Sequence, residues 1–212
     1  IELSLAARSD IEVMWSKALI AQYLAVDGQH SSAIESIESA LLQAKQIFKG
    51  DHPDLAQLYD LAWQTYELVG DSIASVKYLN KQQDIYQNLS PNYLAPLLLL
   101  YQKQFDYYVN ANMFAQARNY AELSLNLCQK FELDCIKTYY NAAHITFLLN
   151  DFGSAIKYAE HWMVDSNESE QFDILNILVK SYWAINDARY IEKLQKLNVQ
   201  DKTPIQNAEY IN

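Results

Sequence analysis

The sequence has few residues that break helices or form turns, with 4 glycines and 4 prolines among 212 residues. A β-sandwich or barrel needs a turn about every 8–12 residues, and collagen-like or low-complexity chains are rich in glycine and proline. The composition excludes these classes. Hydrophobic residues make up 50% of the chain, which is enough for a sizeable core. Together these counts predict a helical protein.

Basic residues are also scarce, since 16 Lys and Arg stand against 26 Asp and Glu and give a formal net charge of −10. Non-specific nucleic-acid binding depends on neutralising phosphates with cations, so we expect no direct nucleic-acid binding by this domain. The longest apolar run, Leu94 to Tyr101, covers 8 residues and is interrupted by Pro96. A bilayer-spanning helix needs about 20 apolar residues, so no membrane span is expected.

The sequence also lacks the common motifs of catalytic and metal sites. The 4 histidines form neither HExxH nor a Cys/His metal spacing, and the 4 glycines are not clustered as a phosphate-binding loop requires. We therefore expect no catalytic residue, no metal site and no cofactor, and we predict that the protein is not an enzyme.

Two cysteines, Cys128 and Cys135, are too few for a disulfide scaffold. A bridge between them is geometrically allowed but would close only a short loop, so the sequence favours two reduced thiols. A bridge would imply an oxidising compartment. The compartment itself stays open, with the bacterial cytoplasm favoured over the periplasm.

What the sequence does contain is an internal repeat built around five turn residues. These are Gly28, Gly70, Asn112, Asn150 and Asn186, spaced by 42, 42, 38 and 36 residues. Glycine, and after it asparagine, is the usual residue where a helix ends in the left-handed conformation. Each turn is therefore predicted to end one helix just before another begins.

The residues on both sides of each turn support this interpretation. Asp71, Asp151 and Asp187 follow their turns directly and are predicted N-caps, with Ser31 or Ser32 in that place in the first copy. Five residues after each turn lies a small residue in four of the five copies, which would let two helices cross closely. These five positions are Ala33, Ser75, Ala117, Ala155 and, in the exceptional fifth copy, Ile191.

The helix before each turn is predicted to bury one stripe of side chains. The positions four, seven and eight residues upstream of the turns are mostly apolar or aromatic, as in Leu24, Ala21 and Ile20. Pro53 and Pro96 lie 25 and 26 residues after Gly28 and Gly70 and are expected to open first helices, where a missing N–H costs least.

With these features the sequence resembles the tetratricopeptide repeat (TPR) superfamily. The resemblance rests on the Gly or Asn turn, the small residue five positions later and the aromatic residue four positions before. The 42-residue copies are similar to the extended repeats of kinesin light chains and of bacterial TPR regulators. The resemblance implies an all-α, right-handed α-solenoid of about five TPR-like hairpins over residues 10–197. Residues 1–9 are expected to be the tail of a preceding repeat helix, and 198–212 a polar tail or short capping helix.

In the TPR superfamily the first helix of each hairpin lines a concave groove, and this resemblance assigns ten candidate groove residues. They are Gln22, Asp60, Gln64, Glu67, Gln102, Asp106, Tyr140, His144, Asn176 and Lys180. The alternative is that they are merely the solvated side of amphipathic helices. Because only Lys180 among them is a cation, a carboxylate-clamp mode is not supported, and a neutral to basic segment is the favoured ligand. Asp60 and Asp106 are expected to lie roughly 10 Å apart on stacked hairpins.

The function predicted from this resemblance is a non-catalytic protein–protein interaction module. It would be the TPR sensory or regulatory region of a larger bacterial signalling or transcription regulator, and would bind a peptide or protein segment in the groove. The alternatives are a receptor domain that senses a peptide or small ligand, and a purely structural scaffold. A homodimer through one end of the array is left open.

Overall fold

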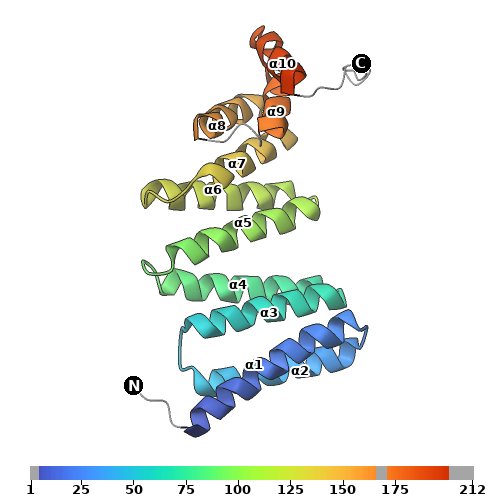
Figure 1. The fold of residues 1–212 in the computed structure, drawn as a ribbon, viewed down its shortest axis with the longest axis vertical. Coiled ribbons are helices and arrows are strands. Elements are labelled where there is room, and N and C mark those ends of the chain that lie inside the picture. The colour runs from blue at the N-terminus through green and yellow to red at the C-terminus, as the bar shows by residue number, and fades with distance from the viewer. Residues whose placement is uncertain (1–4, 166–170, 201–212) are drawn as a thin grey trace. The chain divides into compact units, whose positions relative to one another are not determined.

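The computed structural model describes residues 5–165 and 171–200, and they form helices joined by short connections (Figure 1). The helices are α1 (Leu5–Val26), α2 (His30–Ile47), α3 (Pro53–Val69), α4 (Ser72–Asn88), α5 (Leu94–Asn110), α6 (Phe114–Lys130), α7 (Ile136–Leu148), α8 (Phe152–Asp165), α9 (Gln171–Ala184) and α10 (Arg189–Gln200). No strand occurs within these ranges. They pair in sequence order as five hairpins, which confirms the expected all-α fold class. None of the described helices is long and apolar enough to cross a membrane.

The chain divides into two compact units, Ile1–Leu100 and Tyr101–Asn212, and the division falls within α5. In unit 1, α3 packs on both α1 and α2 of the preceding hairpin. In unit 2, α7 packs on α6, and α9 packs on α7 and α8. Within each unit, therefore, the first helix of one hairpin rests on the hairpin before it, as in a helical repeat.

The predicted left-handed turns are confirmed at all five positions. Gly28 and Gly70 have φ of 80° and 86°, while Asn112, Asn150 and Asn186 have φ between 56° and 59°. After the second turn the Asp71 carboxylate accepts a hydrogen bond from the Ala74 N–H at 3.0 Å, as expected for an N-cap. The first copy differs, because α2 already begins at His30 and its N-cap Gln29 makes no side-chain capping bond. The expectation of a Ser31 or Ser32 cap is therefore wrong.

Replacing Gly70 with valine is expected to destabilise the protein by about 2 kcal/mol, because a β-branched residue is strained at positive φ. Apart from Gly70 itself and its two chain neighbours, no atom lies within 4 Å of the place where a Cβ would sit, so the cost would come from the backbone and not from a clash. The matched control is Asn88→Val at the exposed end of α4, which should cost clearly less. Urea unfolding compares the two variants, and equal losses would contradict the left-handed cap.

The small residues after the turns are buried where the two helices of a hairpin cross. Ala33, Ser75, Ala117 and Ala155 are all completely buried, whereas Ile191 of the fifth hairpin is exposed. A larger side chain at the first four positions would hold the paired helices apart. In the fifth hairpin the side chain at this position is exposed, so isoleucine fits there. Pro53 opens α3 as predicted, and Pro96 lies in the first turn of α5.

Tyrosines four residues before the turns join one hairpin to the next. The Tyr66 hydroxyl on α3 donates to the Glu38 carboxylate on α2 at 2.8 Å, and the Tyr66 ring stacks on Tyr78 with centroids 5.5 Å apart. The Tyr182 hydroxyl on α9 likewise donates to Glu160 on α8. Glu38 and Glu160 each lie ten residues after a turn, so the same repeat positions make the same contact in both units.

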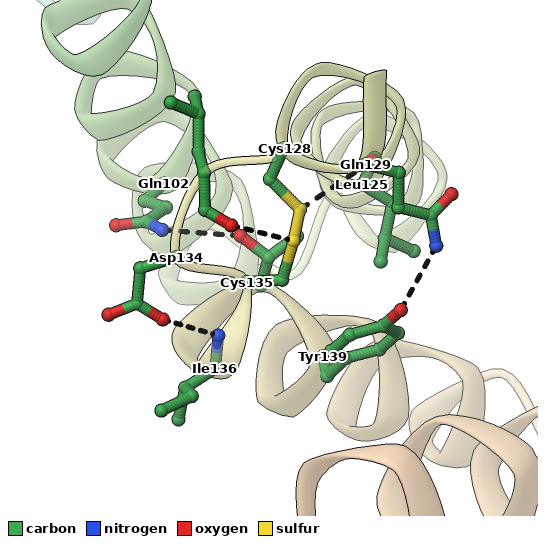
Figure 2. The surroundings of a disulfide bond; sticks show 10 residues. Gln102, Leu125, Cys128, Gln129, Asp134, Cys135, Ile136 and Tyr139 are labelled. Carbon is green, nitrogen blue, oxygen red and sulfur yellow. Dashed lines mark hydrogen bonds between the residues drawn. A yellow bond between two sulfur atoms is a disulfide. The ribbon is translucent and has the colours of Figure 1, made fainter. Parts of the chain in front are cut away.

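A disulfide joins Cys128 at the end of α6 to Cys135 just before α7 (Figure 2). Their Cα atoms are 5.7 Å apart, because the short connection 131–135 turns back on itself. The Asp134 carboxylate accepts a hydrogen bond from the Ile136 N–H at 3.0 Å and so fixes the start of α7. The preference for two reduced thiols is therefore wrong.

The ends of the chain bear on the expected domain boundaries. Helix α1 begins at Leu5, so residues 5–9, which the sequence assigned to a preceding helix, lie in the same helix as residues 10–26. Helix α10 likewise runs on through residues 198–200. The remaining parts of the two expected terminal segments, residues 1–4 and 201–212, lie outside the described residues.

Candidate functional site

In unit 1, three candidate groove residues form a hydrogen-bonded chain across two neighbouring first helices. The Gln22 side-chain amide on α1 donates to the Gln64 carbonyl oxygen on α3 at 2.7 Å. The Gln64 amide in turn donates to the Asp60 carboxylate, one helical turn earlier, at 2.8 Å. All three side chains are half-buried. Residues 42 positions apart in the sequence thus adjoin on one surface, which we call the glutamine ladder.

Glu67 is placed differently from the other candidate groove residues of unit 1. It lies at the exposed end of α3, and its carboxylate accepts a hydrogen bond from the Ser75 hydroxyl on α4. Ser75 is the buried small residue of this hairpin. Glu67 therefore contributes to the turn of its own hairpin, a contact that its register on the helix did not reveal.

In unit 2, Asp106 at the end of α5 is exposed and pairs with Lys137 at the start of α7. Their charged atoms are 3.5 Å apart, and both side chains are more than half exposed. Such a pair adds little stability, because solvent screens it. It does place a cation at the start of α7, the helix that carries the candidate residues Tyr140 and His144. The register of the candidate positions does not reveal Lys137, because it lies 13 residues before its turn, whereas the candidates other than Glu67 lie 6 or 10 residues before theirs.

Gln102, by contrast, is buried in the contact between α5 and α7. Its side-chain amide donates to the Thr138 hydroxyl at 3.3 Å (Figure 2). Thr138 is itself completely buried. Gln102 therefore stabilises the packing of α5 on α7, and little of its side-chain amide is accessible to a ligand.

Tyr140 and His144 lie one turn apart on α7, with ring centroids 6.0 Å apart, and both are half-buried. Burial lowers the pKa of His144, while the carboxylates of Asp173 and Asp106 act in the opposite direction. Burial together with the same two carboxylates raises the pKa of Tyr140. At neutral pH this pair therefore presents uncharged hydrogen-bonding groups on an aromatic surface.

The candidate residues of α9, Asn176 and Lys180, belong to a longer stripe with an aromatic residue at each end. Phe172 and Trp183 are both exposed, and the spacing of the four residues puts them on one side of the helix. Extending the groove register by one turn in each direction would have found both aromatic residues. The stripe can offer apolar contact on either side of one cation.

The charge of the surface differs between the two units. Asp60 and Glu67 make the candidate residues of unit 1 acidic, and no Lys or Arg is among them. In unit 2, Lys137 and Lys180 offset Asp106 and Asp173. The negative charge among the candidate residues is therefore concentrated in unit 1. Within the described ranges, no group of three or more His, Cys, Asp or Glu residues could hold a metal ion.

Solved structures similar to this chain are TPR-like repeat proteins. A kinesin light chain from Podosopora anserina with nearly identical TPR-like repeats is 14% identical, with a TM-score of 0.62, and the match covers 95% of this chain and 100% of that one. BtubC (BKLC) from P. vanneervenii is also 14% identical, with a TM-score of 0.61, and the match covers 96% of this chain and 95% of that one. No protein-family model and no curated protein sequence matches the chain. The shared architecture and the repeated hairpins show that this chain has a TPR-type helical repeat fold.

Proposed function

We propose that this chain is a non-catalytic interaction module that binds an extended peptide or protein segment along the first helices of its hairpins. The observation that supports this most directly is the glutamine ladder. Repeated first helices set equivalent polar side chains next to one another, and an extended ligand with its own regular spacing can follow such a row. As the sequence suggested, the module would serve a larger bacterial signalling or regulatory protein.

The ligand we propose is a neutral to basic segment with at least one aliphatic or aromatic side chain. Asp60 would attract Lys or Arg on the unit 1 surface, because the groove residues there include no competing cation. On the unit 2 surface, Phe172 and Trp183 beside Lys180 would favour apolar side chains next to backbone carbonyls. A purely acidic tail fits neither surface.

Changing both Asp60 and Asp106 to lysine is expected to weaken binding of Lys- or Arg-bearing peptides by on the order of 10-fold, with the largest effect at low salt. A set of extended synthetic peptides that differ only in having Lys, Ser or Glu at one position serves as the probe, read by fluorescence anisotropy. The matched control is Glu35→Lys with Asp84→Lys, the same change of charge at exposed positions of α2 and α4. The control should bind like the wild type.

Other outcomes of this experiment separate the alternative functions. Equal affinities for the Lys, Ser and Glu peptides would contradict the charge preference. If no peptide bound and both double variants kept all partner contacts in cells, a structural scaffold would be the better interpretation. A ligand-sensing receptor would instead gain about 2.7 kcal/mol of stability from a small ligand at 100 times its Kd.

The disulfide bears on where such a module would work. Structural disulfides persist in oxidising compartments and are rare in the cytosol. We therefore favour a compartment outside the cytoplasm over the cytoplasm that the sequence suggested, and with it a signalling or assembly role over direct transcription control.

A further inference from the structure

The connection between α6 and α7, residues 131–135, holds one residue in an unfavourable backbone conformation. Glu132 has φ of 53°, which lies in the left-handed region that residues other than glycine and asparagine rarely adopt. Every other described residue with positive φ is a glycine or an asparagine. Backbone strain of this kind persists only where the surrounding structure enforces it, and it is concentrated at functional and switching segments.

The corresponding connection in unit 1 reaches a left-handed residue without a disulfide. Residues 48–52 connect α2 to α3, and the left-handed position there is Gly50, with φ of 83°. Glycine adopts this conformation without steric cost. In unit 2 a glutamate takes that role, and Cys128 and Cys135 on either side of it are bridged. The bridge therefore enforces a conformation that the residues of this connection do not favour by themselves.

Both cysteines also hold the backbone at the place where α7 begins. Cys135 is the N-cap residue of α7, and its carbonyl oxygen accepts a hydrogen bond from the Tyr139 N–H at 2.9 Å. The Cys128 carbonyl oxygen accepts a hydrogen bond from the Leu133 N–H, also at 2.9 Å. Opening the bridge would therefore loosen the backbone hydrogen bonds on both sides of Glu132.

The other polar contacts around the start of α7 are too weak to replace the bridge. The ion pair between Lys137 and Asp106 is exposed, and so is the hydrogen bond from the Gln129 amide to the Tyr139 hydroxyl at 3.1 Å (Figure 2). Exposed contacts of this kind contribute little, because water competes for both partners. Further along the same helix, three residues are buried in the core and would stay packed, namely Ala142, Ala143 and Ile145.

We propose that the Cys128–Cys135 disulfide is a redox switch for the start of α7. In the oxidised protein the bridge keeps Glu132 left-handed and the first turn of α7 helical. When a dithiol reductant opens the bridge, Glu132 relaxes to negative φ and residues 136–139 lose their helical conformation, while the rest of unit 2 stays folded. Lys137 then separates from Asp106, so the polar surface at this end of α7 changes with the redox state.

The accessibility of the two sulfur atoms sets the course of the reaction. Cys135 is partly exposed and Cys128 is completely buried, so a thiolate of the dithiol attacks the Cys135 Sγ. The Cys128–Cys135 bond breaks, and Cys128 leaves as a thiolate that takes up a proton. The second thiol of the reductant then attacks the mixed disulfide and releases Cys135, so two electrons pass to the protein and the reductant becomes a disulfide.

The reduced state also has hydrogen-bond acceptors for both new thiols. The Cys128 Sγ lies 3.5 Å from the Leu125 carbonyl oxygen, and the Cys135 Sγ lies 3.3 Å from the Leu133 carbonyl oxygen. Each S–H can therefore donate to a backbone oxygen, and reduction leaves neither sulfur as an unsatisfied donor. A folded reduced state is what a reversible switch requires.

Amide hydrogen exchange of the full chain, read by NMR before and after treatment with dithiothreitol, tests the proposal. We expect the Leu133 and Tyr139 amides to exchange at least about 10-fold faster after reduction, and reoxidation to restore the slow rate. The control amide is Ala155, which donates to the Asp151 carbonyl oxygen at 3.0 Å at the start of α8 and should be unaffected. This measurement does not depend on peptide binding, so it is independent of the proposed function.

The matched variant is Glu132→Gly, with Glu132→Asn as a second variant of the same expected direction. Because both residues tolerate positive φ, reduction should accelerate exchange by less than about 3-fold in these variants. Equal exchange rates in the oxidised and reduced wild type would overturn the proposal. Equal acceleration of Ala155 would overturn it as well, since the bridge would then support the whole unit, and so would a full response in both Glu132 variants.

Discussion

Reducing the Cys128–Cys135 disulfide is expected to lower the free energy of unfolding by about 2–3 kcal/mol, because the bridge limits the conformations of the unfolded chain. The closed loop spans only 7 residues of sequence separation, so the effect lies at the lower end for disulfides. Cys128 is completely buried, and its thiol would keep most of its packing after reduction. The loss should therefore come mainly from the greater freedom of the connection between α6 and α7 in the unfolded chain.

Urea unfolding of the oxidised and reduced protein measures this difference. The double variant Cys128→Ala, Cys135→Ala is the control, since reductant should have no effect on it. Thiol titration of unfolded, non-reduced protein should find no reactive thiol. Two reactive thiols in freshly purified protein would show that the bridge is absent, and with it the argument for an oxidising compartment would fail.

Replacing Tyr182 with alanine is expected to cost about 3–5 kcal/mol, the largest effect that we expect from a single substitution in this chain. The ring is completely buried among Trp162, Ile174 and Leu178, where α8 and α9 meet. Its hydroxyl donates to Glu160, and the Arg189 guanidinium lies 4.5 Å from the ring centroid. Truncation removes all three contacts at once and leaves a cavity between two hairpins.

Tyr182→Phe separates the ring from the hydroxyl. It should cost only about 1 kcal/mol, because the half-exposed Glu160 carboxylate can turn to water when its donor is lost. Thermal unfolding and urea unfolding compare both variants with the wild type. If Tyr182→Ala cost no more than Tyr182→Phe, the ring would not be holding the α8–α9 contact together.

The turns of this repeat could be predicted from sequence because their causes are local. A helix must end in a conformation that glycine and asparagine tolerate, and the sparse Gly28, Gly70, Asn112, Asn150 and Asn186 mark those places. The aspartates that follow carry the capping signal in the same few residues. The first copy has no aspartate after its turn, and the serine cap predicted there was wrong.

The candidate site was only partly predictable from sequence. The position of a residue along a helix predicts which side of the helix it lies on, but not which side chains surround it there. Asp60 and Gln64 are hydrogen-bonded to one another, and Gln22 joins them from the neighbouring repeat. Gln102 occupies the same repeat position as Asp60 but is buried in the contact with α7. Glu67 accepts a hydrogen bond from Ser75 of its own hairpin. Which groove positions remain open depends on how closely the next hairpin packs.

The sequence by itself determined the helical class, the five hairpins and the phase of most of the buried stripes, since all of these follow from spacing along the chain. The stripe of α1 is an exception at Ile20, which was predicted to be buried and is 51% exposed. Only the tertiary structure decided that Cys128 and Cys135 meet, that Lys137 lies beside Asp106 and that Gln102 is buried against Thr138. The physical reason is the same in each case. Local periodicity sets which side of a helix is apolar, but only the neighbouring helices determine which atoms come within bonding distance and which surfaces remain exposed to water.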